Sequence, residues 1–143
     1  MTSSAVCKVV NETDIRMDED MLCRCVAETL KHNAVAQKRL NIVIAGEGEI
    51  KALNKRYFGK DVPTDVLSFS DNEDGEYLGE VVICSSFIKK EHKGEKFERE
   101  LCHVAVHGTF HLLGIHHEKD EKSRQELHTQ EEGIINKVLG SQI

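Results

Sequence analysis

Five of the eight histidines in this chain fall in one stretch, His103-Val-Ala-Val-His107-Gly-Thr-Phe-His111-Leu-Leu-Gly-Ile-His116-His117. His107 and His111 are spaced i, i+4, which places both imidazoles on one face of a helix with Cβ atoms about 6 Å apart. Two rings at that distance can bind one transition metal. Gly114 favours a left-handed turn at the end of this helix, so we expect His117 to approach the same ion.

Three neutral histidines leave a fourth coordination position open to water, which is the ligand count of a catalytic zinc site. We therefore predict that the metal ligands are His107, His111 and His117, and that the protein is a metal-dependent hydrolase. Zinc is the expected ion, one per chain, although histidine sites also accept nickel, iron and copper.

The two remaining histidines of the stretch, His103 and His116, each have more than one candidate role. His103 extends the same helix face, but a residue eight positions from His111 lies about 12 Å away along a straight helix, too far to share its ion. We expect His103 to support the site, to face substrate or to be a satisfied core histidine. His116 is either an alternative ligand to His117 or a proton carrier, because imidazole titrates near neutrality.

Length and composition suit one domain spanning residues 1–143. Apolar runs are far shorter than the ~18 residues needed to cross a bilayer, and the first ten residues lack the pattern of a signal peptide. Five scattered cysteines without a secretion signal indicate reduced thiols in the cytoplasm. The net charge of −6 argues against a protein that simply coats nucleic acid.

Hydrophobic periodicity predicts an α+β fold, a mixed four-stranded sheet packed with helices, with the metal site on a helix of the C-terminal half and the turn after it. Asp18 is a candidate helix N-cap, and the last two strands are expected to form a hairpin across a turn-rich segment. The expected strands are 5–11, 40–45, 66–70 and 79–84. The expected helices are 18–32, 47–57, 85–92, 96–113 and 119–139.

Gly108 stands where zinc peptidases of the related helix motif carry the glutamate that acts as general base. Glycine costs about 1 kcal/mol in a helix relative to alanine, so we expect something to approach the backbone closely there. A phosphodiester needs an ion to activate water and cations to bind its non-bridging oxygens. Two basic groups offer such cations: Lys51, Lys55, Arg56 and Lys60, and Lys89, Lys90, Lys93, Lys96 and Arg99.

Three ordered motifs resemble those of the YbeY family of endoribonucleases over roughly residues 40 to 140. The histidine stretch is similar to the family's H-G-x-x-H-L-x-G-x-x-H motif. The segment from Pro63 to Phe69, Pro-Thr-Asp-Val-Leu-Ser-Phe, matches a second motif, and Leu78-Gly-Glu-Val-Val-Ile resembles a third. One departure is Phe58, which follows Tyr57 where the family usually has arginine; Ser70 and His116 also differ from the usual proline and aspartate.

The resemblance implies cleavage of single-stranded RNA by a metal-activated water, in ribosomal RNA maturation and ribosome quality control. It implies zinc on His107, His111 and His117, with His103 or His116 relaying protons. Substrate contacts are then expected from Arg56, Lys60, Thr64, Asp65 and Ser68, with Lys96 and Arg99 as further phosphate contacts. The resemblance also implies ribosomal proteins or assembly factors as partners, and no membrane is expected. Two alternatives stay open: a metallopeptidase-like hydrolase, and a non-catalytic ribosome-assembly module with a structural metal.

Overall fold

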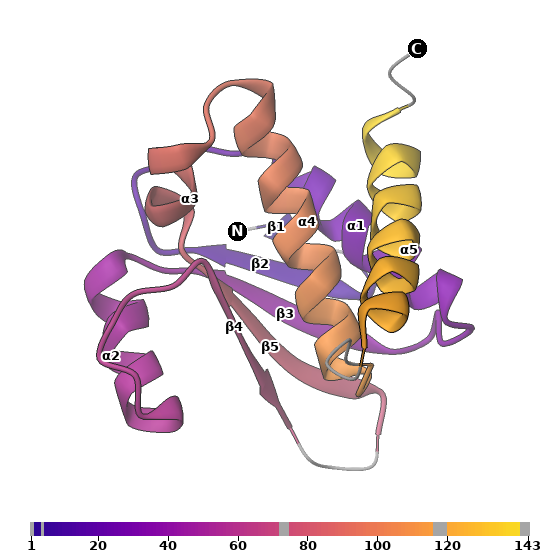
Figure 1. Ribbon diagram of the computed structural model, residues 1–143, viewed down its shortest axis with the longest axis horizontal. Helices are drawn as coiled ribbons and strands as arrows, with labels where there is room; N and C mark the ends of the chain where they lie inside the picture. The colour runs from indigo at the N-terminus through magenta and orange to yellow at the C-terminus, as the bar shows by residue number, and fades with distance from the viewer. Residues whose placement is uncertain (1, 4, 72–74, 116–119, 141–143) are drawn as a thin grey trace.

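The computed structural model describes residues 2–3, 5–71, 75–115 and 120–140 (Figure 1). Its architecture is α+β, as the periodicity of the sequence predicts. In chain order the elements are β1 (Thr2–Ser3), β2 (Cys7–Asn11), α1 (Glu19–His32), β3 (Arg39–Ile44), α2 (Glu47–Phe58), β4 (Val66–Ser70), β5 (Tyr77–Ile83), α3 (Ser85–Glu91), α4 (Glu95–Leu112) and α5 (Glu121–Leu139).

The sheet has the strand order β1-β2-β3-β5-β4 and is mixed. Strands β2, β3 and β5 run parallel, whereas β4 pairs antiparallel with β5. The predicted hairpin is therefore confirmed, and so are the four predicted strands. The structure adds the two-residue β1, which pairs antiparallel with β2. Strand β4 is the strand at the other edge of the sheet, where the two faces meet.

The two faces of the sheet carry different helices (Figure 1). Ile42, Ile44, Val81 and Ile83 belong to the large core under α1, α4 and α5. The alternate residue Val82 belongs to a smaller cluster with Ile50 of α2. Side chains point to opposite faces at successive strand positions, so this division follows directly from the sequence alternation. Helix α4 packs directly on β4 and β5.

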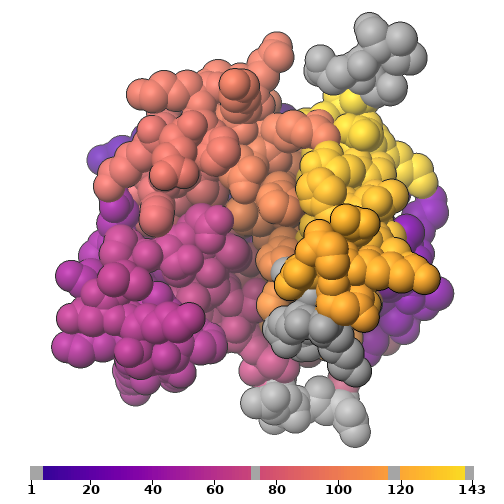
Figure 2. Space-filling model, viewed as in Figure 1, coloured from indigo at the N-terminus to yellow at the C-terminus, as the bar shows by residue number. Residues whose placement is uncertain are grey.

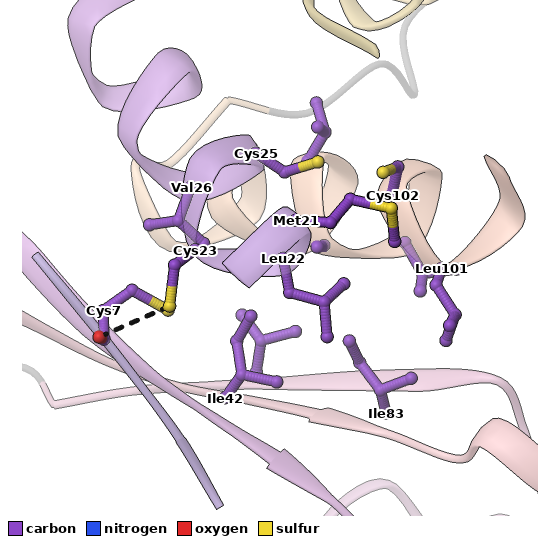
Figure 3. Packing of buried hydrophobic residues seen from close by; sticks show 14 of the residues in the cluster. Cys7, Met21, Leu22, Cys23, Cys25, Val26, Ile42, Ile83, Leu101 and Cys102 are labelled. Carbon is purple, nitrogen blue, oxygen red and sulfur yellow. Dashed lines mark hydrogen bonds between the residues drawn. The ribbon is translucent and has the colours of Figure 1, made fainter. Parts of the chain in front are cut away.

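Four of the five cysteines line the core between β2, α1 and α4 (Figure 3). The Cys23 thiol donates to the Cys7 carbonyl oxygen at 3.5 Å. A thiol hydrogen bond with Cys23 and burial both raise the pKa of Cys7, and a bond with Cys102 and burial raise that of Cys25. All five cysteines are buried and free of disulfides, so they serve as small apolar side chains of the core.

Candidate metal centre

The C-terminal end of α4 is fixed by Gly114. Its φ is +80°, in the left-handed region, and its amide donates to the His111 carbonyl at 2.9 Å. The next amide, of Ile115, donates to the Phe110 carbonyl at 3.0 Å. This pair of bonds is the glycine-dependent motif that closes a helix and turns the chain, so the predicted role of Gly114 is confirmed. His116 and His117 follow Ile115 in the sequence and lie outside the described residues.

His107 and His111 face each other on the last turns of α4. Their Nε2 atoms lie 3.0 Å apart, and their ring centroids lie 4.6 Å apart. Two nitrogens that each lie about 2.1 Å from a tetrahedral zinc are separated by roughly 3.4 Å. A small rotation of either half-buried ring would reach that separation. Two imidazole nitrogens converging on one point fit a divalent transition metal.

Glu131 of α5 orients the first of these rings, and the sequence analysis missed it. Its carboxylate accepts from Nδ1 of His107 at 2.7 Å, which leaves Nε2 of His107 as the atom facing His111. Burial alone raises the pKa of Glu131, but its hydrogen bonds to His103 and His107 outweigh burial and lower the pKa to about 2. Glu131 is only 4% exposed.

A signal for Glu131 was present in the sequence. It occupies the apolar stripe of α5, between Leu127 on one side and Ile134 and Ile135 on the other. An acidic residue in such a stripe needs a partner, because burial of an unpaired carboxylate is costly. The identity of that partner lay beyond sequence reasoning, since His107 is 24 positions away.

His103 joins the same carboxylate from the other side. Its Nε2 lies 3.5 Å from Glu131 Oε1, and its Nδ1 lies 3.1 Å from Glu100 Oε1. Hydrogen bonds to Glu100 and Glu131 raise the pKa of His103 to about 10. His103 thus supports the site through a shared partner.

A second ligand set also exists within the described part of the chain. His103, His107 and Glu131 each offer one donor atom, and these atoms all lie within 4.8 Å of one another. However, the 2.7 Å separation of His107 Nδ1 from Glu131 Oε2 is that of a charge-assisted hydrogen bond. It is shorter than the spacing of two ligands on one tetrahedral ion. The 3.0 Å between His107 Nε2 and His111 Nε2 is likewise a hydrogen-bond distance, so either set would need a small side-chain movement to hold one ion.

Gly108, the residue after His107, faces the sheet. A Cβ there would lie 2.7 Å from Val81 Cγ1 and 3.3 Å from Ser68 Oγ. The expectation that something approaches this backbone closely is confirmed. No side chain at position 108, and so no general base, fits without displacement of β5.

The residues expected to contact substrate fall in three places. Ser68 donates its hydroxyl to the Gly108 carbonyl at 3.4 Å, so it joins β4 to α4. Thr64 and Asp65 line a hollow of about 250 Å³ together with Glu100. Arg56 and Lys60 are exposed at the end of α2 and just beyond it, on the sheet face opposite the histidines. In the second basic group, Arg99 pairs with Glu132 of α5.

The sequence comparisons with known proteins agree on one family. The sequence profile described as Endoribonuclease YbeY matches residues 8–139. An Endoribonuclease YbeY from Vesicomyosocius okutanii is 37% identical over 134 residues, which cover 90% of this chain and 92% of that protein. The Thermotoga maritima relative of the same name is 32% identical, covering 79% and 76%. A solution structure of a Thermotoga maritima protein superposes with a TM-score of 0.66 at 25% identity, covering 94% of this chain and 90% of that one.

Proposed function

Because this chain belongs to the YbeY endoribonuclease family, we propose that it is a metal-dependent endoribonuclease that cleaves single-stranded RNA in ribosomal RNA maturation and contributes to ribosome quality control. The observation that carries the metal dependence is the convergence of His107 Nε2 and His111 Nε2 at 3.0 Å, supported by the bond from His107 to Glu131.

The ligands in this proposal are His107, His111 and His117, with zinc as the ion and nickel or another divalent transition metal as substitutes. Such an ion, when bound, lowers the pKa of water and neutralises charge developing on a phosphodiester. Glu131 holds the proton on Nδ1 of His107 and so fixes the ring orientation that binding requires.

Other side chains of the site are proposed to bind the RNA substrate or to orient the histidines. Thr64 lines the hollow that also contains Glu100, and Glu100 positions His103. His103 and His116 are the proposed proton carriers. Arg56 and Lys60 supply exposed cations for phosphate, a role in which they need no burial. Asp65 and Ser68 complete the proposed substrate set, and Ser68 also holds β4 against α4.

The metallopeptidase alternative loses support at Gly108. Gly108 occupies the position that carries the general base in zinc peptidases, and a side chain there would meet Val81. The chain therefore has the histidine spacing of those peptidases but not their base. The non-catalytic assembly module is tested by the experiment below. The proposed cellular setting is the cytoplasm, with ribosomal proteins or assembly factors as partners. Among the described residues, no helix combines the length and apolarity of a membrane span.

The test is a comparison of wild type, His111→Ala and His128→Ala. Metal content is measured by elemental mass spectrometry, and cleavage of a single-stranded oligoribonucleotide is assayed on the same samples. We expect about one zinc per chain in wild type, with metal and cleavage both lost in His111→Ala. His128 of α5 is the matched control, because its side chain is 64% exposed and it is not one of the proposed ligands. Metal bound without RNA cleavage in wild type would instead support the assembly module.

A further inference from the structure

An exposed aromatic cluster lies at the end of α2. Tyr57 is 54% exposed and Phe58 49%, and with Val62 they are the exposed large hydrophobic residues of the described chain. Both rings pack on Phe69 of β4, with centroids 5.2 Å and 5.8 Å from it. Figure 2 shows the α2 segment, in magenta at the left, at the molecular surface. Single exposed apolar residues are common, but a joined cluster points to a binding surface.

The segment after α2 is fixed in a way that leaves a hollow beside Phe58. Gly59 ends the helix in a left-handed conformation with φ of +71°. The nearly buried Asn54 donates its side-chain amide to the Val62 carbonyl at 3.0 Å and so holds the loop. The result is a hollow of about 530 Å³ whose walls include Phe58, Lys60, Val62, Pro63 and Thr64.

The cluster is surrounded by positive charge although the whole chain carries −6. Residues 51–60 contain four basic side chains and no acidic one: Lys51, Lys55, Arg56 and Lys60. The Arg56 guanidinium lies 5.2 Å from the centre of the Tyr57 ring. Asp61 is an acidic partner on this surface, with its Oδ2 3.9 Å from Lys55 Nζ and both side chains more than 60% exposed. A weak exposed pair of this kind leaves the surface positive.

We propose that Tyr57 and Phe58 form a platform on which an unpaired base of single-stranded RNA stacks, while Arg56 and Lys60 bind the flanking phosphates. Aromatic faces combined with cations are the means by which proteins bind single strands without reading their sequence. The aromatic surface and the local charge together fit this polymer better than an apolar protein partner. The proposal rests on the proposed function for its choice of RNA and adds a base-stacking contact to the phosphate contacts already proposed.

The platform connects with the metal centre around the edge of the sheet. Ser68 of β4 contacts α4, whereas the next residue, Phe69, contacts the platform on the other face. Pro63 and Thr64 line both the hollow beside Phe58 and the hollow that contains Glu100. Glu100 in turn bonds His103. A bound strand would therefore cross the β4 edge on its way from the platform to the histidines.

The test uses a single-stranded oligoribonucleotide carrying 2-aminopurine, whose fluorescence falls when the base stacks. Binding is measured in the His111→Ala background, so that the RNA stays intact, with Phe58→Ala, Phe58→Leu and Phe58→Trp added in turn. We expect quenching on binding, which Phe58→Trp retains and Phe58→Ala and Phe58→Leu reduce. The dissociation constant should rise roughly 5- to 150-fold for the alanine variant, the range for loss of one stacked base.

The leucine variant separates stacking from simple apolar contact, because it keeps a large apolar side chain without a π-face. Unchanged affinity and quenching in both Phe58→Ala and Phe58→Leu would overturn the platform. In the His111-containing protein, Phe58→Ala should raise KM and leave kcat within a few-fold. Failure of wild type to cleave bound RNA would remove the proposed function and leave the platform standing, so the two ideas fail separately.

Discussion

At the residue scale, the proposed metal centre includes a carboxylate that the histidine pattern does not contain. His107 and His111 were predictable because their spacing is local and helical geometry brings i and i+4 together. Glu131 was not, because its contact with His107 depends on how α5 packs against α4. His117 stays a prediction, since it lies outside the described residues.

Glu131→Gln should weaken metal binding about 10- to 100-fold, because an uncharged amide orients the His107 ring less strongly. Affinity is measured by competition with a chromogenic chelator. Glu132→Gln is the matched control. Glu132 is the next residue along α5, but its side chain is 37% exposed and pairs with Arg99 instead of His107. Equal affinity in Glu131→Gln and wild type would show that this carboxylate does not support the metal.

At the element scale, the bounds of the helices and strands could be predicted from the sequence, whereas the order of the strands in the sheet could not. Asp18 caps α1 through a 3.1 Å bond from the Met21 amide, as predicted, and helix bounds agree within two residues. The insertion of β5 between β3 and β4 depends on non-local pairing. Periodicity specifies which face of a strand is apolar, but not which strand becomes its neighbour.

Gly108→Ala tests the close packing of α4 on the sheet. A Cβ would lie 2.7 Å and 3.0 Å from the two methyl carbons of the buried, β-branched Val81, whose side chain cannot rotate away easily. We expect a loss of about 1–3 kcal/mol in the free energy of unfolding, measured by urea denaturation.

Gly133→Ala on α5 is the control for this substitution, because nothing lies within 4 Å of its added methyl group. Helix propensity predicts that this variant gains up to about 1 kcal/mol. Val81→Ala removes the methyl groups that the added Cβ would meet. The double variant should therefore lose less free energy of unfolding than the two single variants lose together. Additive effects would argue against this contact.

At the scale of the whole molecule, the sheet separates a large core, rich in buried thiols, from a smaller cluster under α2. The odd number and scatter of the cysteines predicted reduced thiols, and the structure places all five in the interior with no disulfide. Their mutual contacts came from packing of β2, α1 and α4, which composition does not specify.

Burial of the thiols predicts that the folded protein resists alkylation. The raised pKa values of Cys7 and Cys25 reduce the reactive thiolate at any given pH. With iodoacetamide at about pH 8, mass spectrometry should detect little modification of native protein and five adducts after unfolding in guanidinium chloride. Rapid labelling of any cysteine in the native state would contradict this core.

The central claim is that His107 and His111 share one metal ion, with Glu131 behind them. The most direct measurement is a crystal structure of zinc-loaded protein with anomalous scattering collected at the zinc edge. The account predicts one peak about 2.1 Å from Nε2 of both histidines, with Glu131 still bonded to Nδ1 of His107. A peak bound instead by His103, His107 and Glu131, or by neither set, would contradict it.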